Sequence, residues 1–287
     1  MLPEQSENQK IEVMKGRQFI SPALAGILLI ALYCPVLLWL VGVWLNNPYY
    51  SHGFLVLPIS GFIAWTKREQ LVKATPSIMG IIFLVIGLTT YVLGFVLGIN
   101  WLWAFSILVV TSGLFYYLGG LNTVRTLLFP ICFLVFMIPL PFIDSLAVLM
   151  QTVSASLSAI IAQAAGIPII RTGAEIALPD VALIIGVACS GMNTLYSLLA
   201  LTALLQYLLE ASHYKKVILF LLVFPVAIVA NSLRIVILIM VAHLWGGEAT
   251  VGLLHNFSSL FIFSIAFVLL ILFSRILGCQ FRGIEHV

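Results

Sequence analysis

Apolar residues along this chain occur in long runs that are separated by short polar or basic segments. A helix that crosses a bilayer needs about 20 mostly apolar residues in succession. Eight runs approach or exceed this length, so the pattern predicts an all-α membrane protein with about eight transmembrane helices. The predicted spans cover residues 19–45, 51–66, 76–97, 100–118, 123–143, 189–209, 215–242 and 256–277.

The segment 144–188 departs from this pattern. Its first half, 144–166, has apolar residues at helical spacing and a face of Ser, Thr and Gln, which favours an amphipathic helix on the outer surface over an inserted one. Insertion would also reverse the three helices that follow. In 166–191, Gly173 and Pro179 separate short β-favouring runs, which predicts a short β-hairpin segment whose edge could receive a peptide.

Basic residues orient the predicted helices. Lys and Arg concentrate in cytoplasmic loops, and eight spans that start from a cytoplasmic N-terminus place every basic inter-helix cluster inside. We therefore predict three regions: a cytoplasmic N-terminal tail at 1–18, a single polytopic transmembrane domain at 19–278 with the outer-face insertion 144–188, and a cytoplasmic tail at 279–287. The basic residues concerned are Lys10, Lys15, Arg17, Lys67, Arg68, Lys73, Arg125, Lys215, Lys216, Arg275 and Arg282.

Composition supports the membrane assignment. The chain is 62% hydrophobic and 8% charged, with a mean hydropathy of +1.19, whereas a soluble domain is about 25% charged. A net charge of +3 gives no electrostatic basis for binding nucleic acid. The four cysteines form no CxxC pair, so no metal site is predicted, and nothing in the sequence indicates a cofactor.

Cys189 is the first candidate for chemistry. It lies in VACSGMN, where the extended segment turns into the sixth predicted span, and the small neighbours Ser190 and Gly191 permit a tight turn. A thiolate at a helix N-terminus is stabilised by the helix dipole, and free N–H groups there can stabilise an oxyanion. The alternative is a small residue that packs at a helix start.

Arg234 is the second candidate because it interrupts an apolar span. A charge at the bilayer centre costs about 2.5–3.5 kcal/mol on insertion scales, so such a residue faces the protein interior or a water-filled cavity. It lies about 27 Å along the helix from Lys216, toward the outer side. Asn231 precedes it by one turn on the same face. The alternative role is to hold helices together.

His255, at the outer start of the last span, is the third candidate, although a lone His there can simply cap a helix. With the predicted topology, Cys189, Arg234 and His255 come from three consecutive helices and share the outer part of the membrane. A Cys with a His is the minimum for thiolate catalysis. Tyr50 and His52, at the same face, are supporting candidates for which an interfacial role is the simpler interpretation.

Together these motifs resemble the exosortase/archaeosortase family. ACSG (188–191), NSLR (231–234) and HN (255–256) are similar to its Cys, Arg and His signatures. The resemblance extends over roughly residues 20–280. YSHG with LVLPIS, IPLPF at 138–142, and the G-x-x-I-x-LP pattern at 173–179 are similar to its other recurring segments.

The resemblance implies a membrane cysteine protease or transpeptidase of the PEP-CTERM type. Its partners would be exported proteins with a C-terminal sorting tail, made of a short motif such as Pro-Glu-Pro, a transmembrane span and a basic cluster, together with membrane lipids. It implies an active site at the outer face of the cytoplasmic membrane. Hydrolysis and transpeptidation both stay open.

In this hypothesis Cys189 is the nucleophile, His255 the acid and base, and Arg234 the oxyanion ligand. Backbone N–H groups near Ser190 could assist Arg234, while Asn231 and Asn256 could orient Arg234 and His255. Two other classes of function also fit a polytopic membrane protein: a transporter of anions or small molecules, and a non-catalytic docking protein of an export pathway. Paired broken helices or half-to-half symmetry, typical of transporters, are not found in the sequence.

Overall fold

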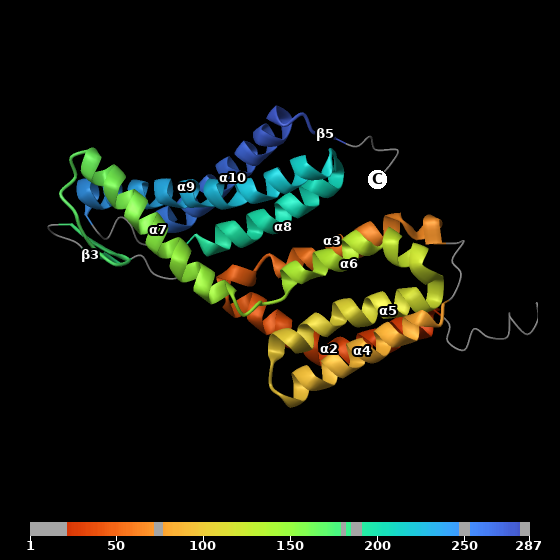
Figure 1. Cartoon of the computed structure of the whole chain (residues 1–287). Coiled ribbons are helices and arrows are strands. Elements are labelled where there is room, and N and C mark those ends of the chain that lie inside the picture. Colours follow the sequence, from red (N-terminus) through yellow and green to blue (C-terminus); the bar gives the residue numbers. More distant parts are fainter. Residues whose placement is uncertain (1–21, 72–76, 179–181, 185–190, 247–252, 282–287) are drawn as a thin grey trace, which may run out of the picture. The chain divides into compact units, whose positions relative to one another are not determined.

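A computed structural model describes residues 22–71, 77–178, 182–184, 191–246 and 253–281 (Figure 1). Its helices follow the predicted apolar runs. They are α2 (Pro22–Asn46), α3 (Gly53–Thr66), α4 (Met79–Val96), α5 (Asn100–Thr126), α6 (Leu128–Phe133), α7 (Ile143–Ala164), α8 (Met192–Leu208), α9 (His213–Trp245) and α10 (Leu253–Ile276). Three 3₁₀ turns accompany them, η1 (Pro48–Tyr50), η2 (Arg68–Leu71) and η3 (Leu134–Met137).

The prediction of an all-α membrane protein is confirmed. In the described part of the chain, the helices that are long and apolar enough to cross a bilayer are α2, α4, α5, α7 and α9. The span predicted at 123–143 is instead divided into the end of α5, then α6 and η3, before the prolines at 139 and 141. The number of eight spans, and the single domain at 19–278, stay predictions.

The α7 helix has both of the properties that made its placement difficult to predict. It runs over Ile143–Ala164 and is apolar enough to span a membrane by length and composition. It also buries a face of small and polar residues, including Ser154 and Ser158, against the rest of the protein. The helix itself is therefore confirmed, while its interfacial position stays a prediction.

By their contacts, the residues fall into two compact units. Unit 1 contains the described parts of Met1–Val41 and Lys67–Ile131, and unit 2 contains those of Gly42–Thr66 and Cys132–Val287. Unit 1 is built on the antiparallel pair α4 and α5. The η2 turn, which carries Arg68 and Glu69, contacts α5 in the same unit. The described residues of the candidate site all belong to unit 2.

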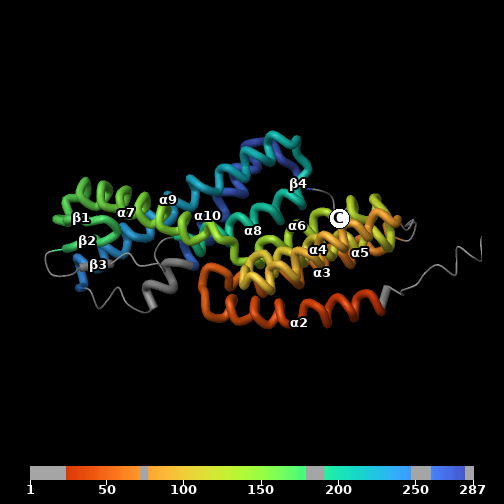
Figure 2. Tube along the Cα trace, turned by 60° about the horizontal axis from the view of Figure 1, so that its bottom comes forward, coloured from red at the N-terminus to blue at the C-terminus, as the bar shows by residue number. Residues whose placement is uncertain are grey.

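In unit 2 the long helix α9 packs against α7, α8 and α10, and the tubes of these helices lie together in Figure 2. Its buried face includes Leu219, Val223, Ala227 and Ile235, at spacings of four or eight residues. Two short strands, β4 (Leu209–Glu210) and β5 (Gln280–Phe281), pair antiparallel at the end of α8. This pairing ties the C-terminal segment after α10 to the turn between α8 and α9.

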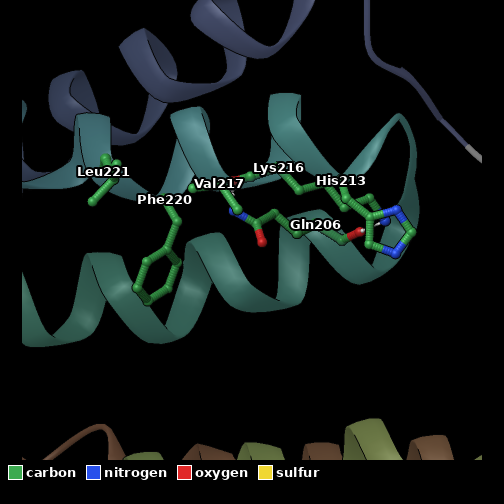
Figure 3. Close-up of a pocket in the computed structure, with 6 residues that line it drawn as sticks. All are labelled: Gln206, His213, Lys216, Val217, Phe220 and Leu221. Atoms are coloured by element: carbon green, nitrogen blue, oxygen red, sulfur yellow. Dashed lines mark hydrogen bonds between the residues drawn. The ribbon is translucent and has the colours of Figure 1, made fainter.

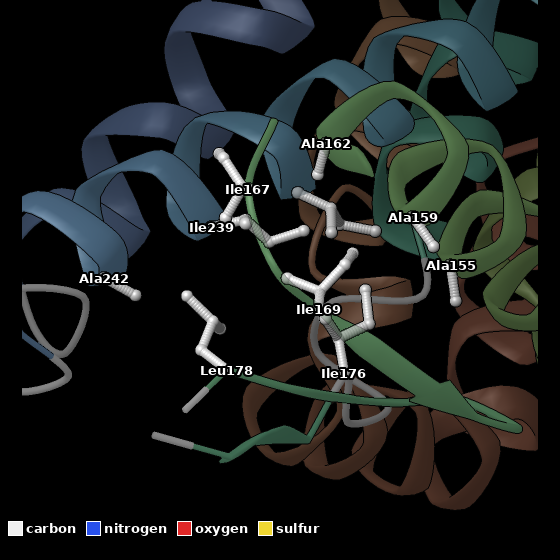
Figure 4. Packing of buried hydrophobic residues seen from close by; sticks show 10 residues of the cluster. Ala155, Ala159, Ala162, Ile167, Ile169, Ile176, Leu178, Ile239 and Ala242 are labelled. Carbon is white, nitrogen blue, oxygen red and sulfur yellow. The ribbon is translucent and has the colours of Figure 1, made fainter. Parts of the chain in front are cut away.

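The predicted hairpin segment is confirmed and extended by a third strand. Strands β1 (Ile170–Thr172), β2 (Glu175–Ala177) and β3 (Ala182–Ile184) form an antiparallel sheet in the order β1-β2-β3. Ile176 of the central strand is fully buried in a cluster between the sheet, α7 and α9 (Figure 4). The α9 members of this cluster are Ile235, Ile239 and Ala242, so the sheet is fastened to the C-terminal third of α9.

Candidate functional site

Arg234 is buried inside unit 2, as its position in an apolar helix predicts. Its exposed fraction is 4%, and the values for Asn231 and Ser232 are 1% and 2%. Ser158 of α7 fixes this part of α9, because its hydroxyl donates to the carbonyl oxygen of Ser232 over 3.0 Å. Three polar residues within one turn of α9, Asn231, Ser232 and Arg234, are thus held in the protein interior.

Gly191 is the residue that joins α8 to this stretch. It caps the N-terminus of α8 with φ +78°, a left-handed conformation in which side chains other than glycine are strained. A Cβ atom added to Gly191 would lie 2.6 Å from Cγ of Asn231. The backbone at the start of α8 therefore rests directly on the Asn231 side chain, one helical turn from Arg234.

Four of the predicted site residues lie wholly or partly outside the described part of the chain. Cys189 and Ser190 lie outside the described residues. His255 and Asn256 lie in the first turn of α10, and their side chains are outside the described part. The helix that carries them packs against both α9 and α8. The structure thus brings together the elements that carry Arg234 and His255, and leaves the contacts of the Cys189 thiol as a prediction.

Tyr50 and His52 are fixed against α8 through one residue that sequence reasoning missed, Tyr196. The rings of Tyr50 and His52 lie 5.6 and 4.9 Å from the ring of Tyr196, both nearly perpendicular to it. The Tyr196 hydroxyl donates to the carbonyl oxygen of Ile138 over 3.1 Å. The only sequence signal for Tyr196 is a phenol within an apolar helix, since a buried hydroxyl needs a partner.

His52 also holds the segment before α7. Its Nε2 donates to the carbonyl oxygen of Phe136 over 3.0 Å. Burial lowers the pKa of His52, and the hydrogen bond to Phe136 opposes this shift. The imidazole is therefore neutral near pH 7. With Nε2 committed to a carbonyl, His52 fits a positioning role better than that of a general base.

Tyr50 is kept in its neutral form as well. Burial raises its pKa, and the negative charge of Asp144 and the neighbouring Tyr49 add to this effect. Tyr50 is 4% exposed, and its ring packs on Tyr196. The YSHG and IPLPF motifs are thus both attached to the first turns of α8, through Tyr50 and His52 on one side and Ile138 on the other.

A cavity of about 280 Å³ opens at the N-terminal end of α9 (Figure 3). It lies where α8 turns into α9, and Gln206 and Lys216 close one side by exchanging hydrogen bonds with each other's main-chain carbonyls, at 2.7 and 2.8 Å. Lys216 is 18 residues before Arg234 along the helix, about 27 Å away. The cavity is therefore separate from the candidate catalytic residues.

A comparison with models of protein families finds a family that matches this chain. The family model described as transmembrane exosortase (Exosortase_EpsH) matches residues 44–272, which is most of the chain. The match spans all the residues that were singled out for chemistry. No curated protein and no solved structure matches the chain.

Proposed function

Because this chain belongs to the transmembrane exosortase family, we propose that it is a cysteine peptidase or transpeptidase. Its substrates are exported proteins, and it cleaves them before a C-terminal sorting tail. The tail consists of a short motif, a hydrophobic span and a basic cluster. The reaction takes place at the outer face of the cytoplasmic membrane.

The observation that carries this proposal is the packing of Gly191 on Asn231. Cys189 precedes Gly191 by two residues, and consecutive Cα atoms are about 3.8 Å apart, so chain connectivity alone keeps the two Cα atoms within about 7.6 Å. Asn231 and Arg234 are three residues apart on α9 and share a face. This packing supports the proposal that the nucleophile Cys189 and the cation Arg234 act in one site.

The reaction begins with attack of the Cys189 thiolate on the scissile carbonyl carbon. His255 takes the thiol proton and returns it to the leaving amine when the C–N bond breaks. The product is a thioester between Cys189 and the exported protein. Attack by water releases a free carboxylate and completes a peptidase cycle, whereas attack by another nucleophile completes a transpeptidase cycle.

Arg234 stabilises the oxyanion of the tetrahedral intermediates. A cation that is held in a water-excluded site stabilises developing negative charge far more than one in bulk water, and it needs no reorganisation during the reaction. Arg234 is 4% exposed, which meets that condition. Burying a charge in a membrane helix is costly, and catalysis accounts for why this cation is placed here.

The proposed orientation rests on the basic residues. In unit 2, Lys215 donates to the carbonyl oxygen of Gly278 over 3.4 Å, and the Arg275 guanidinium lies 5.0 Å from the centre of the Phe281 ring. Basic residues from α9 and α10 therefore share one end of the unit, which we assign to the cytoplasm. With an even number of spans, as the sequence predicts, both termini are then cytoplasmic. The C-terminal half of α9, with Arg234, lies toward the outer side.

The proposal is tested by co-expression with a secreted reporter that carries a Pro-Glu-Pro motif, a hydrophobic span and a basic cluster. Removal of the tail is followed on a gel. We expect Cys189→Ala to abolish processing, and Arg234→Ala and His255→Ala to lower it by at least about 100-fold, the usual scale for loss of an oxyanion ligand or a general base.

Cys34→Ala is the matched control, because Cys34 is exposed and belongs to unit 1. It should process at the wild-type rate at equal membrane levels. Processing by Cys189→Ala would remove the thiol from the mechanism and favour a transporter or a docking protein. Tracer uptake into liposomes that contain the purified protein would then identify a transporter.

A further inference from the structure

The sheet beside the candidate site has one open edge. In the order β1-β2-β3, strands β1 and β3 are the two edges. The β1 edge contacts α7, and the carbonyl oxygen of Ile169, just before it, accepts a hydrogen bond from Gln163 of α7 at 3.2 Å. No described strand pairs with the outer side of β3, so β3 is the edge that can accept another strand.

Strand register identifies the backbone groups on that edge. A two-residue turn, with Gly173 at φ +65°, joins β1 to β2, so Thr172 and Glu175 form the hydrogen-bonded pair next to the turn. Hydrogen-bonded and non-bonded pairs alternate along an antiparallel ladder. Ile176 therefore directs its backbone groups toward its partner Leu183 on β3.

The backbone groups of the two residues beside Leu183 must therefore point away from β2. The N–H and C=O groups of Ala182 and Ile184 are directed outward from β3, and we call these groups the β3 edge. Unpaired backbone groups are not tolerated against lipid chains, and the exposed Arg171 of β1 and Glu175 of β2 place this sheet in an aqueous layer. Water or an extended peptide must satisfy the β3 edge.

The sheet is held at a defined position relative to Arg234. Ile176 is fully buried, and it belongs to the same cluster as Ile235, which is next to Arg234 in the sequence of α9. Along the chain, Ile184 is five residues before Cys189, a reach of at most about 17 Å. One edge strand therefore leads directly from the anchored sheet to the proposed nucleophile.

We infer that the β3 edge binds the substrate: an extended peptide segment beside the scissile bond adds to β3 as a fourth strand. This inference rests on the proposed function. Strand addition supplies main-chain hydrogen bonds that require no particular side chain and holds a peptide extended, as attack on its carbonyl requires.

A peptide fits this edge better than a second copy of the chain does. Pairing of two three-residue strands buries little surface, whereas stable protein interfaces bury about 1,200–2,000 Å². A substrate that is already held in the membrane by its own hydrophobic span reaches the edge at a high effective concentration, so a short strand suffices.

Proline substitution separates backbone pairing from side-chain effects. Ile184→Pro removes one outward N–H group and leaves the β2–β3 ladder intact, which edge strands tolerate. Ile184→Ala is the matched control that keeps the N–H group. Because one net hydrogen bond corresponds to about a three- to tenfold effect, we expect Ile184→Pro to lower tail processing by that factor relative to Ile184→Ala. The double variant Ala182→Pro/Ile184→Pro should lose at least about tenfold.

Binding is measured separately in a Cys189→Ala background, as retention of the unprocessed reporter on the immobilised protein. The double proline variant should lose retention while its thermal stability in detergent stays at the level of Ile184→Ala. Leu183→Pro removes an N–H group that pairs with β2 and therefore disrupts the sheet itself. It should lower both retention and stability, and it serves as the control for a disrupted sheet.

The possible failures are distinguishable. If wild type processes the reporter and the proline variants match Ile184→Ala in both assays, the β3 edge does not bind substrate, although the proposed function stands. A cross-linked dimer that disappears in the proline variants would show that the edge pairs two copies of the chain, which also overturns the inference. Processing by Cys189→Ala would instead overturn the function on which the inference rests.

Discussion

Gly191 connects two parts of the candidate site, the start of α8 and the polar face of α9. The sequence predicts both parts but does not show that they are in contact. Its left-handed φ of +78° turns the chain into α8, and its missing side chain leaves room for Asn231. A change of this one residue should therefore act on the backbone near Cys189 and on the α9 face of Arg234 together.

Gly191→Ala should reduce tail processing by up to about 100-fold, because a shift of about 1 Å in a catalytic group has consequences of that size. The control is Gly98→Ala. Gly98 has a similar φ of +67°, but no atom lies within 4 Å of its added Cβ. Both variants carry the strain of a left-handed alanine, about 1–2 kcal/mol. Equal processing by the two variants would mean that contact with Asn231 has no part in the reaction.

Glycines at intervals of seven residues allow α4 and α5 to pack closely. A Cβ atom added to Gly80, Gly87 or Gly94 would lie within 2.6 Å of Tyr117, Val110 or Trp103, respectively. Between helices in lipid, such small residues favour association because they let the backbones approach. The sequence predicts each of these helices as a span, but the pairing of their faces is a tertiary property.

Gly87→Ala should destabilise the protein by about 1–3 kcal/mol, since overpacking at a close helix contact costs about that much. The added Cβ would lie 2.6 Å from Cγ2 of Val110 and 2.8 Å from its backbone nitrogen. Thermal unfolding in detergent measures the change. Gly26→Ala in α2, where no atom lies within 4 Å of the new Cβ, should leave stability unchanged or raise it slightly. A neutral Gly87→Ala would contradict the close packing of α4 on α5.

The length of α9 has consequences for the whole molecule. With 33 residues it extends about 50 Å, whereas the hydrocarbon core of a bilayer is about 30 Å thick. If Lys215 and Lys216 mark the cytoplasmic boundary, the C-terminal turns of α9 project from the outer side. Those turns are the ones that α7 and the β1-β2-β3 sheet cover.

This arrangement is checked by labelling single cysteines in a variant that lacks the four native ones. Thr172→Cys, on the exposed strand β1, should react with a membrane-impermeant maleimide in intact spheroplasts. Tyr214→Cys, at the exposed start of α9, should react only after the membrane is permeabilised. The opposite pattern would reverse the orientation of unit 2 and place the proposed site in the cytoplasm.

The sequence alone determined the fold class, because the free energy of transfer into lipid depends on local composition, and each predicted apolar run became a helix or a broken helix. It also identified Arg234 as an interior residue and 166–191 as a strand-forming segment, since a buried charge and glycine or proline breaks are visible in short windows. The family resemblance that it carried is confirmed by the family model.

Only the tertiary structure decided which residues meet. His52 donates to Phe136, 84 positions along the chain, and Ser158 donates to the main chain of Ser232, 74 positions along. Tyr196 had no distinctive sequence context, and the packing of Gly191 on Asn231 depends on how α8 crosses α9. Such contacts arise from the way helices bury their faces against one another. The spacing of residues within a single helix does not predict them.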